Sequence, residues 1–228
     1  MKNFAFIFAR GGSKGLPGKN IKPLAGKPLL QYSIDTALAA PSVDQVFVST
    51  DDTEIAAVAS AGGAVVIERP AELASDTSPE WLSWRHGIEW AHTHYGKFDG
   101  FVSLPATSPL RNIDDVEAAI AKRKCAGADI CISVTPASRS PYFNMVKQIN
   151  EDLVELVIKP DGEIARRQDA PAVFDITTVV YATTCDFVLN HYGIFAGKVT
   201  SVEVPKERAV DIDDIYDFKL AEAIIQEH

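Results

Sequence analysis

Cysteine is scarce in this chain, and its few residues follow no metal-binding or disulfide pattern. The three cysteines, Cys125, Cys131 and Cys185, show no C-x-x-C spacing and form an odd set. Structural zinc sites and disulfide frameworks need such spacings or even numbers. The sequence therefore indicates neither, and we expect reduced, buried thiols in a cytoplasmic protein.

Long apolar runs are also missing. The apolar stretch from Phe4 to Phe8 is interrupted by Arg10, and it is shorter than the apolar core of a secretory signal. No other stretch approaches the roughly 20 apolar residues that a helix needs to cross a bilayer. We therefore expect no membrane partner.

Positive charge is in deficit overall but is concentrated near the N-terminus. The chain has 22 basic and 31 acidic residues and a net charge of −9. A dispersed acidic surface repels nucleic-acid phosphates, so we expect no nucleic-acid partner. Residues 1–34, however, carry six basic residues and no acid. Any site for a small anion is therefore expected there.

Strand-like and helix-like segments alternate along most of the chain. Apolar strand patterns occur at residues 4–8, 45–49, 64–67, 101–104, 129–134, 174–181 and 199–204. Helical patterns begin near Pro28, after Asp52, at Ser78-Pro79 with Ser78 as the N-cap, and after Asn112. This alternation predicts an α/β fold with a mostly parallel central sheet and helices on both faces. We expect a single domain over residues 1–228.

The alternation is interrupted between residues 136 and 171. This stretch is irregular and strand-prone, with a turn at Asn150-Glu151-Asp152. Turn residues between short strand-like pieces are typical of a segment outside the main sheet. We therefore expect an excursion from the domain at about residues 136–171.

A basic, glycine-rich loop follows the first strand. Between Ala9 and Asn20 it holds four glycines together with Arg10, Lys14 and Lys19. Backbone N–H groups and fixed positive charge at the end of a strand favour phosphate binding. A solvated surface turn is the alternative, but it leaves the interleaved cations unexplained.

Two better-known phosphate loops do not fit this stretch. A P-loop has serine or threonine after its lysine, whereas Lys19 is followed by Asn20. The dinucleotide fingerprint also fails, because the glycines recur at 12, 15 and 18 and no ribose-binding acid follows about 20 residues later. A nicotinamide-dependent oxidoreductase is therefore disfavoured.

A pair of acids near the C-terminus complements the basic loop. On an extended segment Asp211 and Asp213 point the same way, while Ile212 packs into the core. Two carboxylates together with substrate phosphates form a usual magnesium site. Capping of the final helix is the alternative, and Asp214 can provide the cap while Asp211 and Asp213 bind Mg²⁺.

Five short motifs together carry a family resemblance. They are Ala9 to Asn20, Val48-Ser49-Thr50-Asp51, Arg69 to Thr77, Thr107-Ser108-Pro109-Leu110-Arg111 and Asp211-Ile212-Asp213. In content and order they resemble the motifs of acylneuraminate cytidylyltransferases, the CMP-sialic acid synthetases. The resemblance implies a Rossmann-like nucleotidyltransferase fold and transfer of CMP from CTP to the anomeric hydroxyl of a nonulosonic acid, with release of pyrophosphate. It also implies a need for Mg²⁺ and a homodimer.

The same resemblance implies roles for individual residues. The expected CTP contacts are Arg10, Gly12, Ser13, Lys14, Lys19, Asn20, Arg69 and Ser78. Catalysis is expected from Arg10 and Lys19 together with the metal ligands Asp211 and Asp213. The expected sugar contacts are Arg167, Gln168, Asp175, Thr177 and Tyr181. Residues 136–171 match the family's dimerisation excursion, through which Arg167 can act in the partner's site.

The acceptor pocket departs from that of the sialic acid enzymes. Pro105-Ala106 stands where they commonly have a glutamine-proline pair, and Asp175 and Thr177 stand where they have arginine and asparagine. The stretches that look more like the CMP-legionaminic acid branch are Ser140 to Val146, Arg167 to Pro171 and Phe174-Asp175. The expected acceptor is therefore a legionaminic-type acid, with sialic and pseudaminic acids still open. The alternative role for Asp175 is a salt bridge to Arg166 or Arg167.

Two further functions remain open. A CMP-Kdo-type synthetase, which uses an eight-carbon acid, usually has Arg-Leu-Pro where this chain has Lys14-Gly15-Leu16-Pro17. A non-catalytic nucleotide-binding module is disfavoured by the retained acids and cations. No histidine falls in a motif, so the general base is a carboxylate, a metal-bound water or the substrate's own carboxylate.

Overall fold

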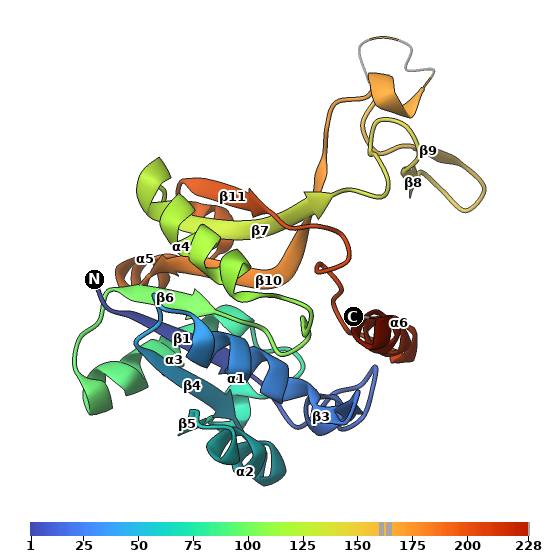
Figure 1. The fold of residues 1–228 in the computed structure, drawn as a ribbon. Helices are drawn as coiled ribbons and strands as arrows, with labels where there is room; N and C mark the ends of the chain where they lie inside the picture. Colours follow the sequence, from blue (N-terminus) through green and yellow to red (C-terminus); the bar gives the residue numbers. More distant parts are fainter. Residues whose placement is uncertain (160–161, 163–165, 228) are drawn as a thin grey trace.

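The computed structural model of the chain describes residues 1–159, 162 and 166–227, and a seven-stranded sheet runs through its centre (Figure 1). The strands of this sheet are β1 (Asn3–Phe8), β4 (Gln45–Thr50), β5 (Val65–Glu68), β6 (Gly100–Ser103), β7 (Ile130–Pro136), β10 (Phe174–Thr184) and β11 (Val199–Glu203). Their order is β11-β7-β10-β6-β1-β4-β5. Only β10 runs antiparallel to its neighbours, β6 and β7. The predicted mostly parallel α/β sheet is confirmed, and the antiparallel strand inside it was not predicted.

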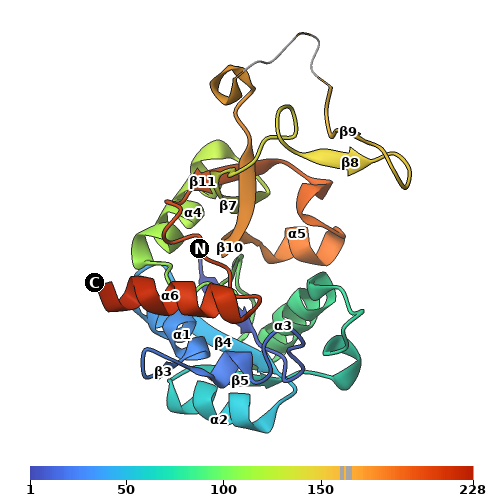
Figure 2. The same ribbon diagram turned by 90° about the vertical axis from the view of Figure 1, so that its right-hand side faces the viewer.

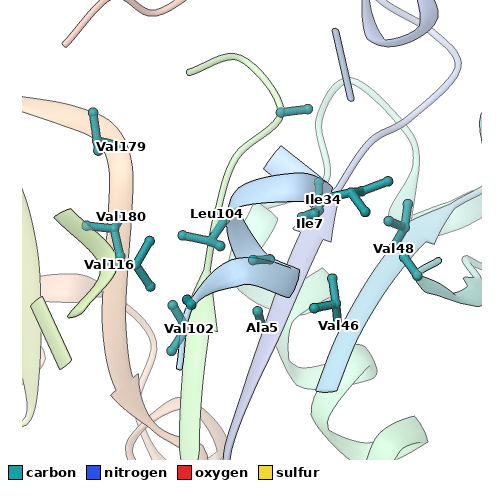
Figure 3. Packing of buried hydrophobic residues seen from close by; sticks show 14 of the residues in the cluster. Ala5, Ile7, Ile34, Val46, Val48, Val102, Leu104, Val116, Val179 and Val180 are labelled. Carbon is teal, nitrogen blue, oxygen red and sulfur yellow. The ribbon is translucent and has the colours of Figure 1, made fainter. Parts of the chain in front are cut away.

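Helices cover both faces of the sheet, as expected. The helices on one face are α1 (Leu29–Ala39), α2 (Thr53–Ala61) and α4 (Ile113–Ala126), and those on the other are α3 (Glu80–Tyr95) and α5 (Cys185–Asn190). Figure 3 shows aliphatic side chains of the strands on the first face, with Ile34 of α1 and Val116 of α4 among them. On the second face, Phe6 and Phe101 pack against Trp84 of α3. Burial on both faces explains the continuous apolar strand patterns.

The helices begin close to where their capping residues predict. The Asp52 side chain accepts hydrogen bonds from two backbone N–H groups of α2, and Asn112 forms a capping box with Asp115 at the start of α4. The predicted cap of α3 is wrong by one residue. Pro79 is the N-cap, because its backbone is still extended (ψ of 132°) and Glu80 is the first residue of the helix. The Oγ atom of Ser78 is buried and has no hydrogen-bond partner in the described part of the chain.

An arm, residues 137–173, leaves the sheet between β7 and β10 and points away from it in both views (Figures 1 and 2). It contains the antiparallel hairpin of β8 (Val146–Gln148) and β9 (Val154–Leu156) and the short 3-10 helix η3 (Arg167–Asp169). Asn150 forms the turn of the hairpin by accepting hydrogen bonds from the N–H groups of Asp152 and Leu153. The side chain of Arg167 lies outside the described residues.

The C-terminal helix α6 (Ile215–Glu227) packs against the N-terminal loop region instead of the sheet (Figure 2). The shared apolar cluster consists of Leu16, Leu24, Leu29, Ile212, Phe218 and Ala221. The small hairpin of β2 (Pro23–Leu24) and β3 (Lys27–Pro28) contributes to it and turns through Ala25 and Gly26, both with positive φ. This cluster joins the loop region after β1 to the C-terminal segment. None of the helices in the described residues has both the length and the apolar character that crossing a membrane requires.

Candidate active site

The basic loop lies at the carboxyl end of β1, next to the carboxyl end of β4. Gly11 N–H donates to Asp51 Oδ1 at 3.1 Å, and Asn20 Nδ2 donates to the Arg10 carbonyl at 3.0 Å. Leu16 is buried in the cluster with α6. The loop is thus held at both ends and in its middle. In α/β sheets, ligands bind at the carboxyl ends of the strands.

The predicted acid pair meets the loop directly. Lys19 Nζ donates to the Ile212 carbonyl at 2.5 Å and lies 3.8 Å from Asp213 Oδ1. A Cβ atom at Gly15 would collide with the Asp213 carbonyl, so only glycine permits this approach. Ile212 is fully buried, as the spacing predicted. The loop and the acid segment therefore form one site, although about 200 residues separate them in sequence.

Asp214, and not the acid pair, caps the last helix. Asp214 Oδ1 accepts hydrogen bonds from Tyr216 N–H at 2.7 Å and Asp217 N–H at 3.1 Å. In return, Asp217 Oδ2 accepts from the backbone N–H groups of Asp213 and Asp214. The expected division of this acidic run is confirmed for Asp214. The carboxylates of Asp211 and Asp213 take no part in the cap.

Asp211 is the more buried member of the pair. Burial raises the pKa of its carboxyl group, and the charge of Asp213 adds to the rise, whereas the side chains of Thr107 and Thr178 oppose it. Its Oδ1 atom is buried and has no hydrogen-bond partner among the described residues. A buried carboxylate oxygen without a donor is costly unless a cation or a ligand group satisfies it.

Two adjoining cavities contain most of the expected nucleotide contacts. A cavity of about 360 Å³ is lined by Phe8, Arg10, Arg69, Ser78, Glu80, Thr107, Thr178, Tyr181, Asp211 and Asp213, among others. A neighbouring one of about 300 Å³ is lined by Arg10, Ser13, Lys14, Lys19, Asn20 and Asp213, among others. Gly12 lies on the same loop and is exposed, with open space beside it. The two cavities share Arg10 and Asp213, so both a cation and a carboxylate lie where they adjoin.

Arg69 is fixed in the wall of the first cavity. Its Nε donates to Ser49 Oγ at 3.1 Å and its second terminal nitrogen donates to the Ser49 carbonyl at 2.6 Å. The guanidinium also lies over the Phe8 ring, 5.6 Å from the ring centre. Burial lowers the pKa of Arg69 from its usual value, with the carboxylates of Asp51 and Glu80 opposing the change. The side chain therefore presents a rigid donor to a ligand.

Asp76 forms ion pairs with two of the loop cations. Arg10 lies 2.7 Å from Asp76 Oδ1, and Lys14 lies 2.5 Å from Asp76 Oδ2. Hydrogen bonds from Lys14 and Arg10 lower the pKa of the Asp76 carboxyl group. A carboxylate of the protein therefore pairs with two of the three loop cations.

A third cavity, of about 620 Å³, adjoins the first through Asp211 and is lined by Asp175 and Thr177. Thr177 Oγ1 donates to Ser133 Oγ at 2.8 Å, so its hydroxyl is already paired. Asp175 is exposed and accepts a long hydrogen bond of 3.4 Å from Ser138 N–H. We call this cavity the acceptor cavity, after the sugar contacts predicted at Asp175 and Thr177.

The remaining sugar-contact predictions fall elsewhere. Tyr181 lines the first cavity, where burial raises its pKa to about 12. Gln168 lies exposed on η3 of the arm. Arg166 forms two hydrogen bonds of 2.9 Å with Asp169, so the alternative in which it pairs with Asp175 is wrong. For Arg167, the side chain is not described.

The sequence analysis missed Thr178 as a residue of the site. The register of β10 shifts between Thr177 and Tyr181, and Thr178 faces the first cavity there, with its hydroxyl 2.7 Å from Ser108 Oγ. The buried guanidinium of Arg111 fixes this irregularity by donating to the Val179 carbonyl at 2.6 Å, and burial lowers its pKa to about 9. Bulges re-aim side chains but leave no clear mark in a sequence.

Comparison with known proteins identifies the family. A model of the cytidylyltransferase family matches residues 4–227. The chain belongs to the cytidylyltransferase family. This cytidylyltransferase is 34% identical over 222 residues to CMP-N,N'-diacetyllegionaminic acid synthase of Campylobacter jejuni, covering 96% of this chain and 93% of that protein. It is also 34% identical over 224 residues to the post-translational flagellin modification protein B of Campylobacter coli, covering 97% and 94%.

The fold agrees with that of other nucleotidyltransferases. A solved CMP:2-keto-3-deoxy-manno-octonic acid synthetase, complexed with CTP, superposes with a TM-score of 0.75 over 100% of this chain and 99% of that chain. At 19% identity this likeness concerns the fold alone. The predicted Rossmann-like nucleotidyltransferase fold is therefore confirmed. The match to the cytidylyltransferase family confirms the predicted enzyme class.

Proposed function

We propose that this cytidylyltransferase transfers CMP from CTP to the anomeric hydroxyl of a legionaminic-type nonulosonic acid and releases pyrophosphate. One observation carries the proposal: Asp211 is shared between a cation-lined nucleotide cavity and a separate acceptor cavity. The two substrates of a transfer reaction need adjoining sites of this kind. The relative named as a CMP-N,N'-diacetyllegionaminic acid synthase supports the acceptor class.

The loop cations supply the electrostatics of the transfer. Attack of a hydroxyl on the α-phosphorus of CTP builds negative charge on the phosphoryl oxygens and on the leaving pyrophosphate. Arg10, Lys14 and Lys19 line the cavities where those groups would lie. Preorganised cations in such positions lower the barrier because they need not reorganise during the reaction. Arg69, which hydrogen bonds to Ser49 fix in the cavity wall, would contact the nucleoside.

The acid pair fits a magnesium ion. Asp211 offers a buried carboxylate oxygen that lacks a donor, and the exposed Asp213 carboxylate lines the same cavity. Hard oxygen ligands shared with substrate phosphates suit Mg²⁺. When bound, the ion would neutralise phosphate charge and orient the nucleotide. The described residues contain no cluster of three metal-binding side chains, which agrees with a site completed by phosphate oxygens.

Asp175 suits an acceptor that carries amide groups. Its carboxylate lines the acceptor cavity, is exposed and holds only one long hydrogen bond. A carboxylate accepts hydrogen bonds but donates none when ionised. The N–H groups of an acylated amino sugar would therefore donate to it.

We further propose that the protein works as a homodimer in the cytoplasm, where CTP is available. The arm carries large exposed apolar side chains, among them Val146 at 58% and Val154 at 61% exposure. Exposed apolar surface on a projecting hairpin is typical of an interface with another chain. In a dimer, Arg167 of the arm would reach the partner's acceptor cavity. The three cysteines are free, as expected for a reducing compartment. Cys131 and Cys185 are buried as predicted, but the prediction is wrong for Cys125, which is exposed.

A doubly substituted arm will not dimerise. Val146→Asp combined with Val154→Asp places charges on exposed apolar positions of both hairpin strands. We expect the mass measured by light scattering to fall from twice 24.7 kDa to 24.7 kDa, because a buried unpaired charge strongly opposes association. An unsubstituted protein that is already monomeric would contradict the dimer.

Removal of the Asp76 charge will strengthen nucleotide binding. Asp76→Asn leaves Arg10 and Lys14 without their carboxylate partner, so the triphosphate no longer competes with it. Because these ion pairs are exposed, we expect the Kd for CTP, measured by calorimetry, to fall only about two- to fivefold. Glu72→Gln, nearby but without an ion pair among the described residues, is the control. Weaker binding by the Asn variant would show that Asp76 orients the cations for CTP.

The decisive test of the function is pyrophosphate release with CTP and Mg²⁺ over a panel of acceptors. The panel should hold legionaminic, pseudaminic and sialic acids, Kdo and a control without sugar. Release that is fastest with a legionaminic-type acid supports the proposal. Preference for Kdo would move the enzyme to the eight-carbon class. If folded protein binds CTP but releases no pyrophosphate with any acid, the proposed reaction is wrong.

A further inference from the structure

The acceptor cavity is acidic except for one side chain. Among its described lining residues, Asp175, Glu207, Asp211 and Asp217 carry carboxylates, and Lys206 carries the only positive charge. A cavity with this balance repels an anion unless a cation receives it. The acceptor of the proposed function is a 2-keto acid sugar, whose carboxylate must enter this cavity together with the reacting hydroxyl.

Lys206 is free to receive that carboxylate. Its Nζ atom donates to Ser138 Oγ at 2.7 Å, a neutral partner, and it forms no ion pair within the described residues. An ammonium group has three N–H donors, so two remain available. The neighbouring Arg208 differs, because its Nε and one terminal nitrogen donate to the buried Asp115 at 3.1 and 2.9 Å. Arg208 therefore has a carboxylate partner, whereas Lys206 has none among the residues that the structure describes.

The position of Lys206 also fits the chemistry. It lies five residues before Asp211, and both side chains line the same cavity. In a 2-keto acid sugar, the carboxylate is bonded to the anomeric carbon, which also bears the attacking hydroxyl. A cation that holds the carboxylate thus restricts the hydroxyl to the neighbourhood of Asp211 and of the nucleotide cavity. Orientation of this kind contributes directly to rate.

We propose that Lys206 binds the carboxylate of the acceptor and thereby selects 2-keto acids and positions their anomeric hydroxyl. This assignment rests on the proposed function. The ammonium of Lys206 forms a charge-assisted hydrogen bond with the acceptor carboxylate, while Asp175 receives the N–H groups of the sugar. The acidic lining then rejects anions that cannot reach the ammonium.

The test compares Lys206→Met with Lys219→Met. Lys219 is exposed on α6, does not line the cavity, and its loss changes the net charge equally. With the preferred nonulosonic acid, we expect the KM of the Lys206 variant for the acid to rise about 10- to 100-fold, as for loss of a hydrogen bond to a charged group. Its KM for CTP should stay the same. Lys206→Arg should retain most of the affinity, because it keeps the charge.

The methyl ester of the same acid gives a readout that a merely structural role would not change. The unsubstituted enzyme should prefer the free acid, and Lys206→Met should lose that preference, whereas Lys219→Met should keep it. An unchanged ratio of acid to ester, or an unchanged KM for the acid, would overturn the role of Lys206 while leaving the proposed function standing. If the unsubstituted enzyme uses no nonulosonic acid at all, the proposed function fails and this assignment fails with it.

Discussion

Asp211→Asn will reduce turnover about 10²- to 10³-fold while the protein stays folded. The substitution keeps the shape of the side chain but removes the charge that would hold Mg²⁺ beside the triphosphate. It also neutralises the buried carboxyl group, whose Oδ1 atom has no hydrogen-bond partner among the described residues. Pyrophosphate release at saturating CTP, with the Mg²⁺ concentration varied, measures the loss. We expect that added Mg²⁺ restores little of it.

The stability of the same variant should move in the opposite direction. Burial raises the pKa of Asp211, so the folded state favours the protonated carboxyl group. The protonated carboxyl group adds to the free energy of unfolding at low pH. This contribution is lost as the pH rises through the pKa that Asp211 has in the folded state, because the buried group then ionises. Asparagine stays neutral. Without Mg²⁺, Tm of the variant should therefore match the unsubstituted protein near pH ~4 and exceed it by a few degrees near pH ~8.

Asp214→Asn is the matched control for both measurements. It makes the same chemical change three residues away, at the N-cap of α6. Asparagine caps helices about as well as aspartate, so fold and turnover should both be retained. If Asp211→Asn turned over at a near-normal rate, the acid pair would have no catalytic role.

Lys19→Met will weaken the use of CTP by about 10²- to 10³-fold in kcat/KM. Lys19 is the most buried of the loop cations, with 10% of its side chain exposed, compared with 34% for Arg10 and 79% for Lys14. A cation shielded from water interacts more strongly with phosphate than an exposed one. Lys19 also connects the loop to Ile212 and Asp213. Its loss should therefore raise KM for CTP and lower kcat together.

Two other lysines of the same region serve as comparisons. Lys14→Met removes an exposed cation of the cavity and should cost about tenfold or less. Lys22→Met removes a lysine that lies over the Phe218 ring outside the cavities and should leave the CTP dependence unchanged. If the Lys19 and Lys22 variants lost kcat/KM for CTP equally, the loss would indicate misfolding. If the Lys19 variant depended on CTP concentration as the unsubstituted protein does, Lys19 would have no role in binding the triphosphate.

The acceptor side of the site shows the limit of sequence reasoning most clearly. Asp175 and Thr177 were predicted as a pair of selectors, and both line the acceptor cavity. In the fold, the Thr177 hydroxyl is paired with Ser133, and only Asp175 remains free enough to choose between acceptors. The sequence did not predict Lys206 as a site residue, because it belongs to no motif. Its role depends on which side chains surround it.

The sequence by itself determined the features that depend on neighbouring residues. Local spacing and backbone chemistry account for the basic glycine loop after β1, the cap provided by Asp214 and the two acids on either side of the buried Ile212. Tertiary structure alone decided what meets across long separations in the chain. The examples are the ion pairs of Asp76 with the loop, the bulge that turns Thr178 towards Ser108, and the cavity that Lys206 shares with Asp175. The physical reason is the same for each of them. Strand register and helix packing place these side chains, and both arise from contacts between segments that are distant in sequence.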